Sequence, residues 1–274
     1  MKKKSAYISM IASVMLFVMM ITGAGDAAFG ASRSGIDLIG HRGYSGKYPE
    51  NTMAAFRGAY KNGFEGIEVD IWESDNGDLM IFHDENTKDL TGRSAKIWKV
   101  NSRNRKKFKV RQKGRKELIP TLQEVLRYSQ KTGLTVLLHV KNCPKHHMSK
   151  KGAARVAGLI KKYKVEDRVV VFASSAKVMK KFRGKGVRLG RLCTSAKRKD
   201  VNKTVAWLVK NHGDTLILHK VSKIKKKGLR RDIVKYCHKR NIQIGTYWTY
   251  NKKELKYLRS IGADFAMSNY RLKK

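Results

Sequence analysis

The spacing of hydrophobic residues predicts alternating strands and helices from residue 36 onward. Short, almost continuously apolar runs that are bounded by turn residues are typical of buried strands. Nine such runs occur, at residues 36–40, 66–72, 79–82, 135–140, 168–173, 187–192, 215–219, 242–248 and 264–267. Most of them are separated by segments long enough for a helix, and this alternation favours an α/β fold with a parallel sheet.

The segments between the strands carry helical periodicity and end signals. Thr121 with Glu124 makes a capping box at the start of one helix. Asn51 or Thr52 is placed to cap an earlier one. We predict helices at residues 52–62, 121–131, 150–163, 176–183, 200–211, 226–240 and 252–261.

The second and third predicted strands depart from this alternation. The turn at Asn76 and Gly77 is too short for the helical crossover that parallel neighbours need. The chain has 274 residues, only three prolines and no Gly/Ser-rich linker, and α/β barrels commonly use about 250 residues as one domain. We therefore predict a single TIM-type (β/α)8 barrel over residues 31–274, slightly irregular around the second and third strands.

The N-terminus has the pattern of a targeting segment. Three lysines at residues 2–4 precede an uncharged apolar run at residues 6–22, and small residues follow up to Ala31. We predict a signal peptide at residues 1–30, with an uncleaved membrane anchor as the alternative. The mature protein is then secreted or associated with the cell surface.

Chemically versatile side chains gather at the ends of the predicted strands. The residues at or just beyond a strand end are His41, Asp70, His83, Lys141 and Trp248. Because the carboxyl ends of barrel strands meet at one face, we expect these side chains to share a site. Glu68 points to the same side as Asp70, since strand side chains alternate. Paired carboxylates, Arg42 and two imidazoles suit chemistry on a phosphate diester.

The order of the short motifs gives a family resemblance. The motifs, in chain order, are His41-Arg42-Gly43, Pro49-Glu50-Asn51-Thr52, Glu68-x-Asp70, His83-Asp84, Ile119-Pro120-Thr121-Leu122 and Trp248-Thr249. This series resembles the glycerophosphodiester phosphodiesterase family, whose fold is a phosphatidylinositol-phospholipase-C-like phosphodiesterase barrel. The resemblance covers roughly residues 36–270. It implies metal-dependent hydrolysis of a glycerophosphodiester to glycerol phosphate and an alcohol.

The resemblance also implies roles for individual residues. One of His41 and His83 is expected to act as general base and the other as general acid, and Arg42 and Lys141 are expected to bind the substrate phosphate. Further members of the expected site are the pocket residues Glu50 and Trp248 and the metal ligands Glu68, Asp70 and His139. The expected cofactor is a divalent cation, Mg²⁺ or Ca²⁺.

His139 departs from the family pattern, because related enzymes have a glutamate two residues before the lysine that corresponds to Lys141. Mg²⁺ and Ca²⁺ prefer oxygen ligands, whereas Zn²⁺ and Mn²⁺ accept imidazole more readily. Three outcomes are open. The site takes Zn²⁺ or Mn²⁺, it binds Mg²⁺ or Ca²⁺ more weakly through Glu68, Asp70 and water, or it has lost turnover and kept binding.

The charge of the chain is uneven. Its net charge is +40, yet residues 37–90 hold eleven acidic and five basic residues, whereas residues 91–274 hold nine acidic and 52 basic ones. The densest basic run, residues 103–116, is expected to overhang the substrate face or to form a solvated surface. An exported protein meets anionic wall polymers and lipid headgroups rather than nucleic acid, so the former are the expected partners.

Two functions follow from the sequence. The first is an exported phosphodiesterase that acts on a small glycerophosphodiester or on a glycerol-phosphate polymer. The alternative is a catalytically impaired barrel that binds anionic polymers or lipid headgroups at the cell surface. A phospholipase D of the same barrel type is disfavoured, because the connection at residues 86–119 lacks the cysteines expected there.

Overall fold

The structure, a computed structural model, describes residues 35–219 and 228–272. The predicted signal peptide lies outside the described residues, and so do residues 226–227 of one predicted helix.

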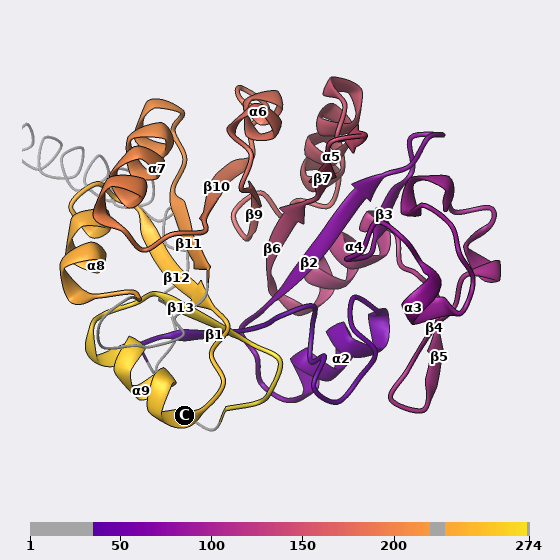
Figure 1. Cartoon of the computed structure of the whole chain (residues 1–274), viewed down its shortest axis with the longest axis horizontal. Helices are drawn as coiled ribbons and strands as arrows, with labels where there is room; N and C mark the ends of the chain where they lie inside the picture. The colour runs from indigo at the N-terminus through magenta and orange to yellow at the C-terminus, as the bar shows by residue number, and fades with distance from the viewer. Residues whose placement is uncertain (1–34, 220–227, 273–274) are drawn as a thin grey trace, which may run out of the picture.

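Eight parallel strands close into a barrel within the described residues (Figure 1). The closure is made by β1, which pairs with β2 on one side and with β13 on the other. The barrel strands are β1 (Asp37–Gly40), β2 (Gly66–Glu73), β6 (Thr135–Val140), β9 (Val169–Ala173), β10 (Arg188–Cys193), β11 (Thr215–His219), β12 (Gln243–Tyr247) and β13 (Phe265–Ser268). The predicted TIM-type barrel is confirmed.

The ninth predicted strand, β3 (Leu79–Ile81), is not part of this parallel series. It folds back on β2 in antiparallel pairing, with Ile81 opposite Ile71. Gly77 makes the sharp turn between the two strands possible, because its φ of +90° is a conformation that other residues rarely adopt. The irregularity expected around the second and third strands is therefore present, and it returns the chain to the level of Asp70, since the Phe82 amide donates to the Asp70 carbonyl at 3.0 Å.

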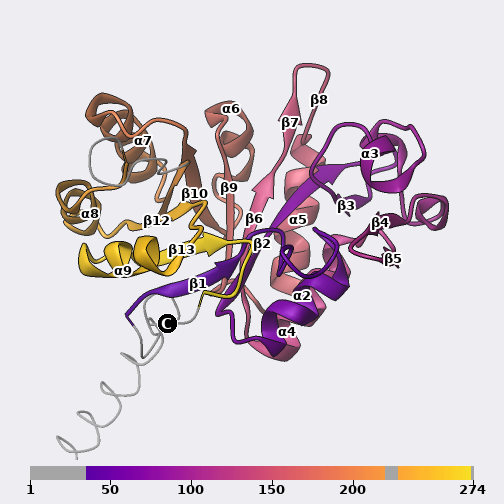
Figure 2. The same ribbon diagram turned by 60° about the horizontal axis from the view of Figure 1, so that its bottom comes forward.

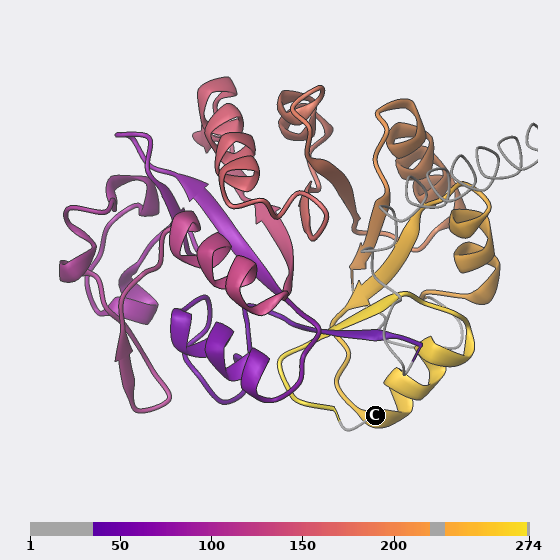
Figure 3. The same cartoon turned by 180° about the vertical axis from the view of Figure 1, so that it is seen from behind.

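The helices lie outside the strands, as the turned views show (Figures 2 and 3). Their bounds are α2 (Met53–Lys61), α4 (Leu122–Thr132), α5 (Lys150–Lys162), α6 (Ala176–Met179), α7 (Arg198–Lys210), α8 (Arg231–His238) and α9 (Lys252–Ser260). Most ends agree with the sequence pattern within two residues. Two ends differ. The helix predicted from residue 226 begins in the structure at Arg231 (α8), and the last residues of the helix predicted at 176–183 form a 3₁₀ turn, η3 (Lys180–Phe182). None of the described helices is both long and apolar enough to cross a membrane.

The structure shows which of two neighbouring polar residues, Asn51 or Thr52, caps α2. Thr52 is the cap of α2, and its hydroxyl accepts from the Ala55 amide. Asn51 is consequently free to turn toward the barrel. The capping box of Thr121 and Glu124 at α4 is present as predicted.

The connection between β3 and α4 contains structure that the sequence did not reveal. It holds α3 (Lys88–Thr91), the 3₁₀ turns η1 (Ile97–Lys99) and η2 (Arg105–Lys107), and a hairpin of β4 (Val110–Gln112) and β5 (Arg115–Glu117). A second small hairpin, β7 (Asn142–Cys143) with β8 (His146–His147), follows β6. The first connection packs Ile97, Val100 and Val110 against Trp72 and Met80 of the β2–β3 hairpin. Its strands were missed because they are only three residues long and mostly charged.

The core has two main layers. The larger one lies between the strands and the helices, and the smaller one fills the inside of the barrel. Interior residues include Leu137, Val170, Ile217 and Phe265. Gly245 is needed beside Phe265, because a Cβ at this position would lie 2.2 Å from the phenyl ring. This filled interior supports the polar side chains at the carboxyl ends of the strands.

Candidate active site

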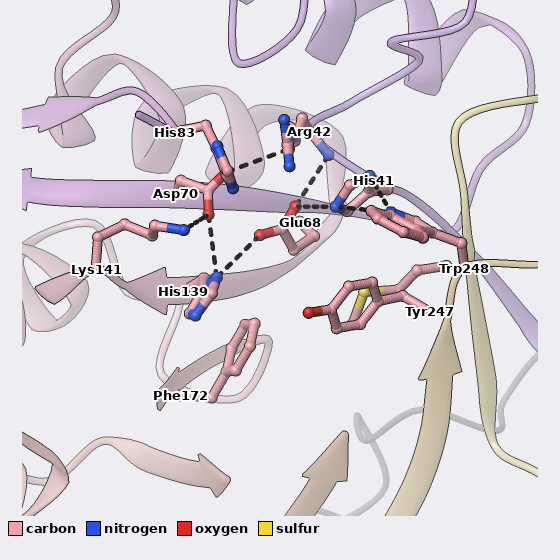
Figure 4. Close-up of a pocket in the computed structure, with 11 residues that line it drawn as sticks. His41, Arg42, Glu68, Asp70, His83, His139, Lys141, Phe172, Tyr247 and Trp248 are labelled. Carbon is pink, nitrogen blue, oxygen red and sulfur yellow. Dashed lines mark hydrogen bonds and ion pairs between the residues drawn. The ribbon is translucent and has the colours of Figure 1, made fainter. Parts of the chain in front are cut away.

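A pocket of about 200 Å³ is lined by residues of β2, β6, β9, β12 and β13 and of the segments that follow β1, β3, β6 and β12 (Figure 4). Its lining residues are His41, Arg42, Glu68, Asp70, His83, His139, Lys141, Phe172, Tyr247, Trp248 and Met267. Eight of the nine site residues predicted from the sequence are therefore together. The exception is Glu50, which lies behind Arg42.

The turn after β1 aims two of these side chains into the pocket. Arg42 has a φ of +56° and Gly43 one of +76°. A Cβ at Gly43 would come within 2.8 Å of the Ala55 backbone, so only glycine fits this approach to α2. The tight turn leaves the Arg42 amide free to donate to Oε2 of Glu68 at 3.0 Å.

Glu68, Asp70 and His139 form a candidate metal site. Asp70 of β2 lies directly opposite His139 of β6 in the sheet register. Nδ1 of His139 lies 3.0 Å from Oδ1 of Asp70 and 3.8 Å from Oε1 of Glu68. One potential ligand atom from each of the three residues lies within 4.8 Å of the others. Two carboxylates and one imidazole at this spacing fit a divalent cation.

Glu68 and Asp70 are only 2% and 1% exposed, so a negative charge on both carboxylates at once is unfavourable without a compensating positive charge. Burial, and next the charge of Asp70, raise the pKa of Glu68 well above its usual range. The charge of Asp70 is balanced by Nζ of Lys141 at 3.5 Å and by Nε of Arg42 at 3.6 Å. Asn51 also donates from Nδ2 to Oδ2 of Asp70 at 2.9 Å. A bound cation would complete this balance at Glu68.

His41 is held as a neutral imidazole. Burial, followed by the nearby Arg42 charge, lowers the pKa of His41 to about 3. A proton on Nδ1 lets the ring donate to Oδ1 of Asn269 at 2.7 Å. Nε2 is then the basic nitrogen, and it lies 3.9 Å from Oε2 of Glu68. The ring is therefore unprotonated at neutral pH, and in this tautomer the indole nitrogen of Trp248 donates to Nε2 at 3.4 Å.

His83 has a different environment, because its side chain is 31% exposed and Nδ1 lies 2.6 Å from Oδ1 of Asp84. The hydrogen bond from His83 is the largest cause of the lowered pKa of Asp84. A carboxylate in this position fixes the orientation of the His83 ring through Nδ1. Nε2 of His83 is the ring nitrogen that this contact leaves available to a substrate.

Arg42 is positioned by a partner outside the pocket. Nη1 donates to Oε1 of Glu50 at 2.8 Å. The Glu50 amide in turn donates to Oε1 of Gln112 in β4 at 3.0 Å. Glu50, predicted as a pocket residue, therefore holds the guanidinium that faces the pocket and ties it to the β4–β5 hairpin.

Aromatic rings pack against the imidazoles of His41 and His139. Phe172 of β9 stacks on His139 with ring centroids 4.6 Å apart and planes 10° apart. Tyr247 stacks on His41 at 5.5 Å, and Trp248 packs edge-on against the same ring at 5.8 Å. Trp248 thus walls the pocket as predicted.

Several site residues were not assigned a role from the sequence. They are Asn51, Asp84, Phe172, Tyr247 and Asn269. Four of them lie at or just beyond strand ends, the same signal that pointed to Lys141. Asn51 lies beside the cap of α2 and gave no such signal.

The basic run at residues 103–116 contributes no side chain to the pocket wall. Arg105 is engaged elsewhere, since Nη1 lies 2.6 Å from Oε2 of Glu124 and donates to the Ile119 carbonyl at 3.0 Å. Arg115 lies over the ring of Tyr48. Burial of the apolar residues Phe108 and Val110 packs the segment onto the β2–β3 hairpin. That the basic side chains of this run overhang the substrate face stays a prediction.

The fold and the pocket together define a TIM-type barrel with a candidate metal site beside the cationic side chains of Arg42 and Lys141. The model of the glycerophosphoryl diester phosphodiesterase family matches residues 41–271. The chain belongs to this family.

Named relatives share parts of the chain. A glycerophosphodiester phosphodiesterase from Bacillus altitudinis is 30% identical over 139 residues, which cover 49% of this chain and 56% of that protein. Human glycerophosphodiester phosphodiesterase 1 is 38% identical over 117 residues, which cover 40% of this chain and 35% of the human protein. The matched part thus spans about half the length, or less, of these curated relatives.

Solved structures show the same fold over nearly the whole chain. An Oleispira antarctica phosphodiesterase in complex with the product sn-glycerol-3-phosphate has a TM-score of 0.74 and 21% identity, covering 85% of this chain and 93% of that one. A Thermotoga maritima glycerophosphodiester phosphodiesterase has a TM-score of 0.66 and 23% identity, covering 85% and 94%.

Proposed function

We propose that this protein is an exported, divalent-metal-dependent phosphodiesterase that hydrolyses glycerophosphodiesters to glycerol phosphate and an alcohol. The observation that supports this most strongly is the content of one pocket. It combines a potential metal-ligand set with two cations, Arg42 and Lys141, and with two imidazoles in different environments. Family membership supports the reaction class. The product held by the Oleispira antarctica relative supports a small, phosphate-bearing substrate.

Glu68, Asp70 and His139 are the residues that would hold the metal. When bound, a divalent cation would stabilise the negative charge that develops on the phosphate oxygens. Mg²⁺ or Ca²⁺ is expected from the family, and Zn²⁺ or Mn²⁺ is favoured by the imidazole ligand. Arg42 and Lys141 would bind the same phosphate from the protein side.

The two histidines divide the proton transfers. Neutral His41 would accept the proton from the neighbouring hydroxyl of the glycerol, whose oxygen then attacks phosphorus. The bond from phosphorus to the leaving alcohol breaks, and His83 would give its proton to the departing alkoxide. Water, with the proton transfers reversed, then opens the cyclic phosphate to glycerol phosphate.

Metal removal tests this proposal directly. The purified protein should hydrolyse glycerophosphocholine, should lose at least about 99% of that rate after treatment with a chelator, and should recover it when a divalent cation is added back. Turnover is measured by release of choline, and metal content by elemental analysis. Full activity in metal-free protein would overturn the proposal. Metal binding without turnover of any glycerophosphodiester would favour the impaired, polymer-binding alternative.

The identity of residue 139 should set the metal preference. His139→Glu is expected to bind Mg²⁺ and Ca²⁺ at least about tenfold more tightly than the native protein, because an anionic oxygen ligand replaces a neutral nitrogen. Calorimetric titration of metal-free protein measures this change. His139→Gln is the matched control, since it has the same length without the charge. An unchanged metal profile in His139→Glu would remove this residue from the ligand set.

Export forms part of the proposal. It rests on the lysine-rich start and the apolar run at residues 6–22, which lie outside the described residues. The large positive charge supports a location beside anionic cell-surface material.

A further inference from the structure

A second cavity lies outside the active-site pocket and is lined by residues of α2, the start of α4 and the segment that contains the β4–β5 hairpin. We call it the lateral cleft. Its volume is about 310 Å³. Its charged lining residues are Arg57, Arg105, Lys109, Lys116, Glu117 and Glu124.

The charges in the lateral cleft do not balance. Arg105 and Glu124 neutralise each other at 2.6 Å. Arg57, Lys109 and Lys116 are exposed, and no carboxylate of the described residues lies within 4.0 Å of their side-chain nitrogens. Glu117 offsets one of these three charges. The lateral cleft therefore keeps an excess of positive charge in a concave site, which suits an anionic ligand.

The lateral cleft is also close to the active-site pocket along the chain. Met53, the first residue of α2, lines the cleft. Asn51, two residues earlier, donates to Asp70 in the pocket. Two residues of extended chain span at most about 7 Å. A single short segment of backbone thus separates the two sites.

We propose that the lateral cleft binds further phosphates of an extended glycerol-phosphate chain while one diester of that chain lies in the active-site pocket. This inference rests on the proposed function for the substrate class. A small diester has one phosphate and is bound by the pocket alone, so the lateral cleft acts only on a polymer. A single flexible chain can enter a concave site of this size, whereas the headgroups of a lipid bilayer present a broad surface.

Two triple variants with the same charge change test this proposal. Arg57→Gln/Lys109→Gln/Lys116→Gln removes the unpaired cations of the lateral cleft. Arg103→Gln/Lys106→Gln/Lys107→Gln is the control, because it removes three exposed charges from the same basic body that do not line the cleft. Binding of a fluorescent glycerol-phosphate oligomer is followed by anisotropy in low salt. Turnover of glycerophosphocholine is measured in parallel.

The cleft variant should bind the oligomer about tenfold more weakly, because each exposed ion pair contributes up to about fivefold. The control should lose at most about twofold, and turnover of glycerophosphocholine should be unchanged in both. The difference between the cleft variant and the native protein should shrink as salt reduces the screening length from about 30 Å at 0.01 M to about 8 Å at 0.15 M.

Other outcomes overturn the proposal. An equal loss of oligomer affinity in both variants would show that the oligomer is attracted by the overall positive charge of the protein and not by the cleft. No loss of affinity in either variant would show that the cleft does not bind the oligomer. An equal loss of binding to phosphatidylglycerol vesicles in the cleft variant would assign the site to a membrane. Melting temperatures verify folding, and Lys109→Gln/Lys116→Gln replaces the triple variant if that one is unstable. If native protein does not hydrolyse glycerophosphocholine, the proposed function fails, while oligomer binding still decides the role of the cleft.

Discussion

His41→Ala and His83→Ala should each lower turnover of a glycerophosphodiester at least about a hundredfold, because each removes one general acid or base. The melting temperature should change little for His83→Ala, whose side chain is 31% exposed, and should fall for His41→Ala, whose buried ring packs against Tyr247 and Trp248. Steady-state kinetics with glycerophosphocholine, which has a poorly activated leaving alcohol, measures the loss. His147→Ala is the control, because it removes an exposed imidazole outside the pocket.

The leaving alcohol separates the roles of the two histidines. With a diester of a strongly acidic alcohol, which needs no protonation to leave, His83→Ala should recover most of its rate and His41→Ala should not. A near-normal rate of either variant on glycerophosphocholine would show that the assignment of acid and base is wrong. Equal recovery of both variants would leave His83 without the role of the acid.

Glu68→Gln and Asp70→Asn should abolish the dependence of turnover on added divalent cation and lower the rate by on the order of a thousandfold. A cation that stabilises a developing phosphate charge contributes several kcal/mol, and each 1.4 kcal/mol corresponds to about tenfold in rate. Calorimetry of the metal-free variants should show cation binding weakened together with the rate. The exposed Asp89→Asn serves as the control for the loss of one negative charge. Retention of native metal affinity by either site variant would exclude that carboxylate as a ligand.

Much of the candidate site was accessible from the sequence because strand ends in a barrel meet at one face. Eight of the nine predicted residues line the pocket. The role of Glu50 could not be predicted in this way. Its motif marked it as a site residue, but only the structure shows that it binds the guanidinium of Arg42 and does not line the pocket. Asn51 shows the same limit. The sequence did not show whether Asn51 or Thr52 caps α2. In the structure Asn51 donates a hydrogen bond to Asp70, and Thr52 caps the helix.

The local pattern of the chain by itself determined the barrel strands, most helices and the residues placed at strand ends, because these depend on side-chain periodicity and on capping groups a few residues apart. Only the tertiary structure decided how those ends meet. The antiparallel return of β3 brings the chain back beside β2 just before His83, and the β2–β6 register sets His139 against Asp70. Packing also decided which cations remain unpaired, since it brings Arg57 of α2 to Lys109 and Lys116 and pairs Arg105 with Glu124. Such contacts join residues far apart in the chain, and their geometry depends on the packing of the complete barrel.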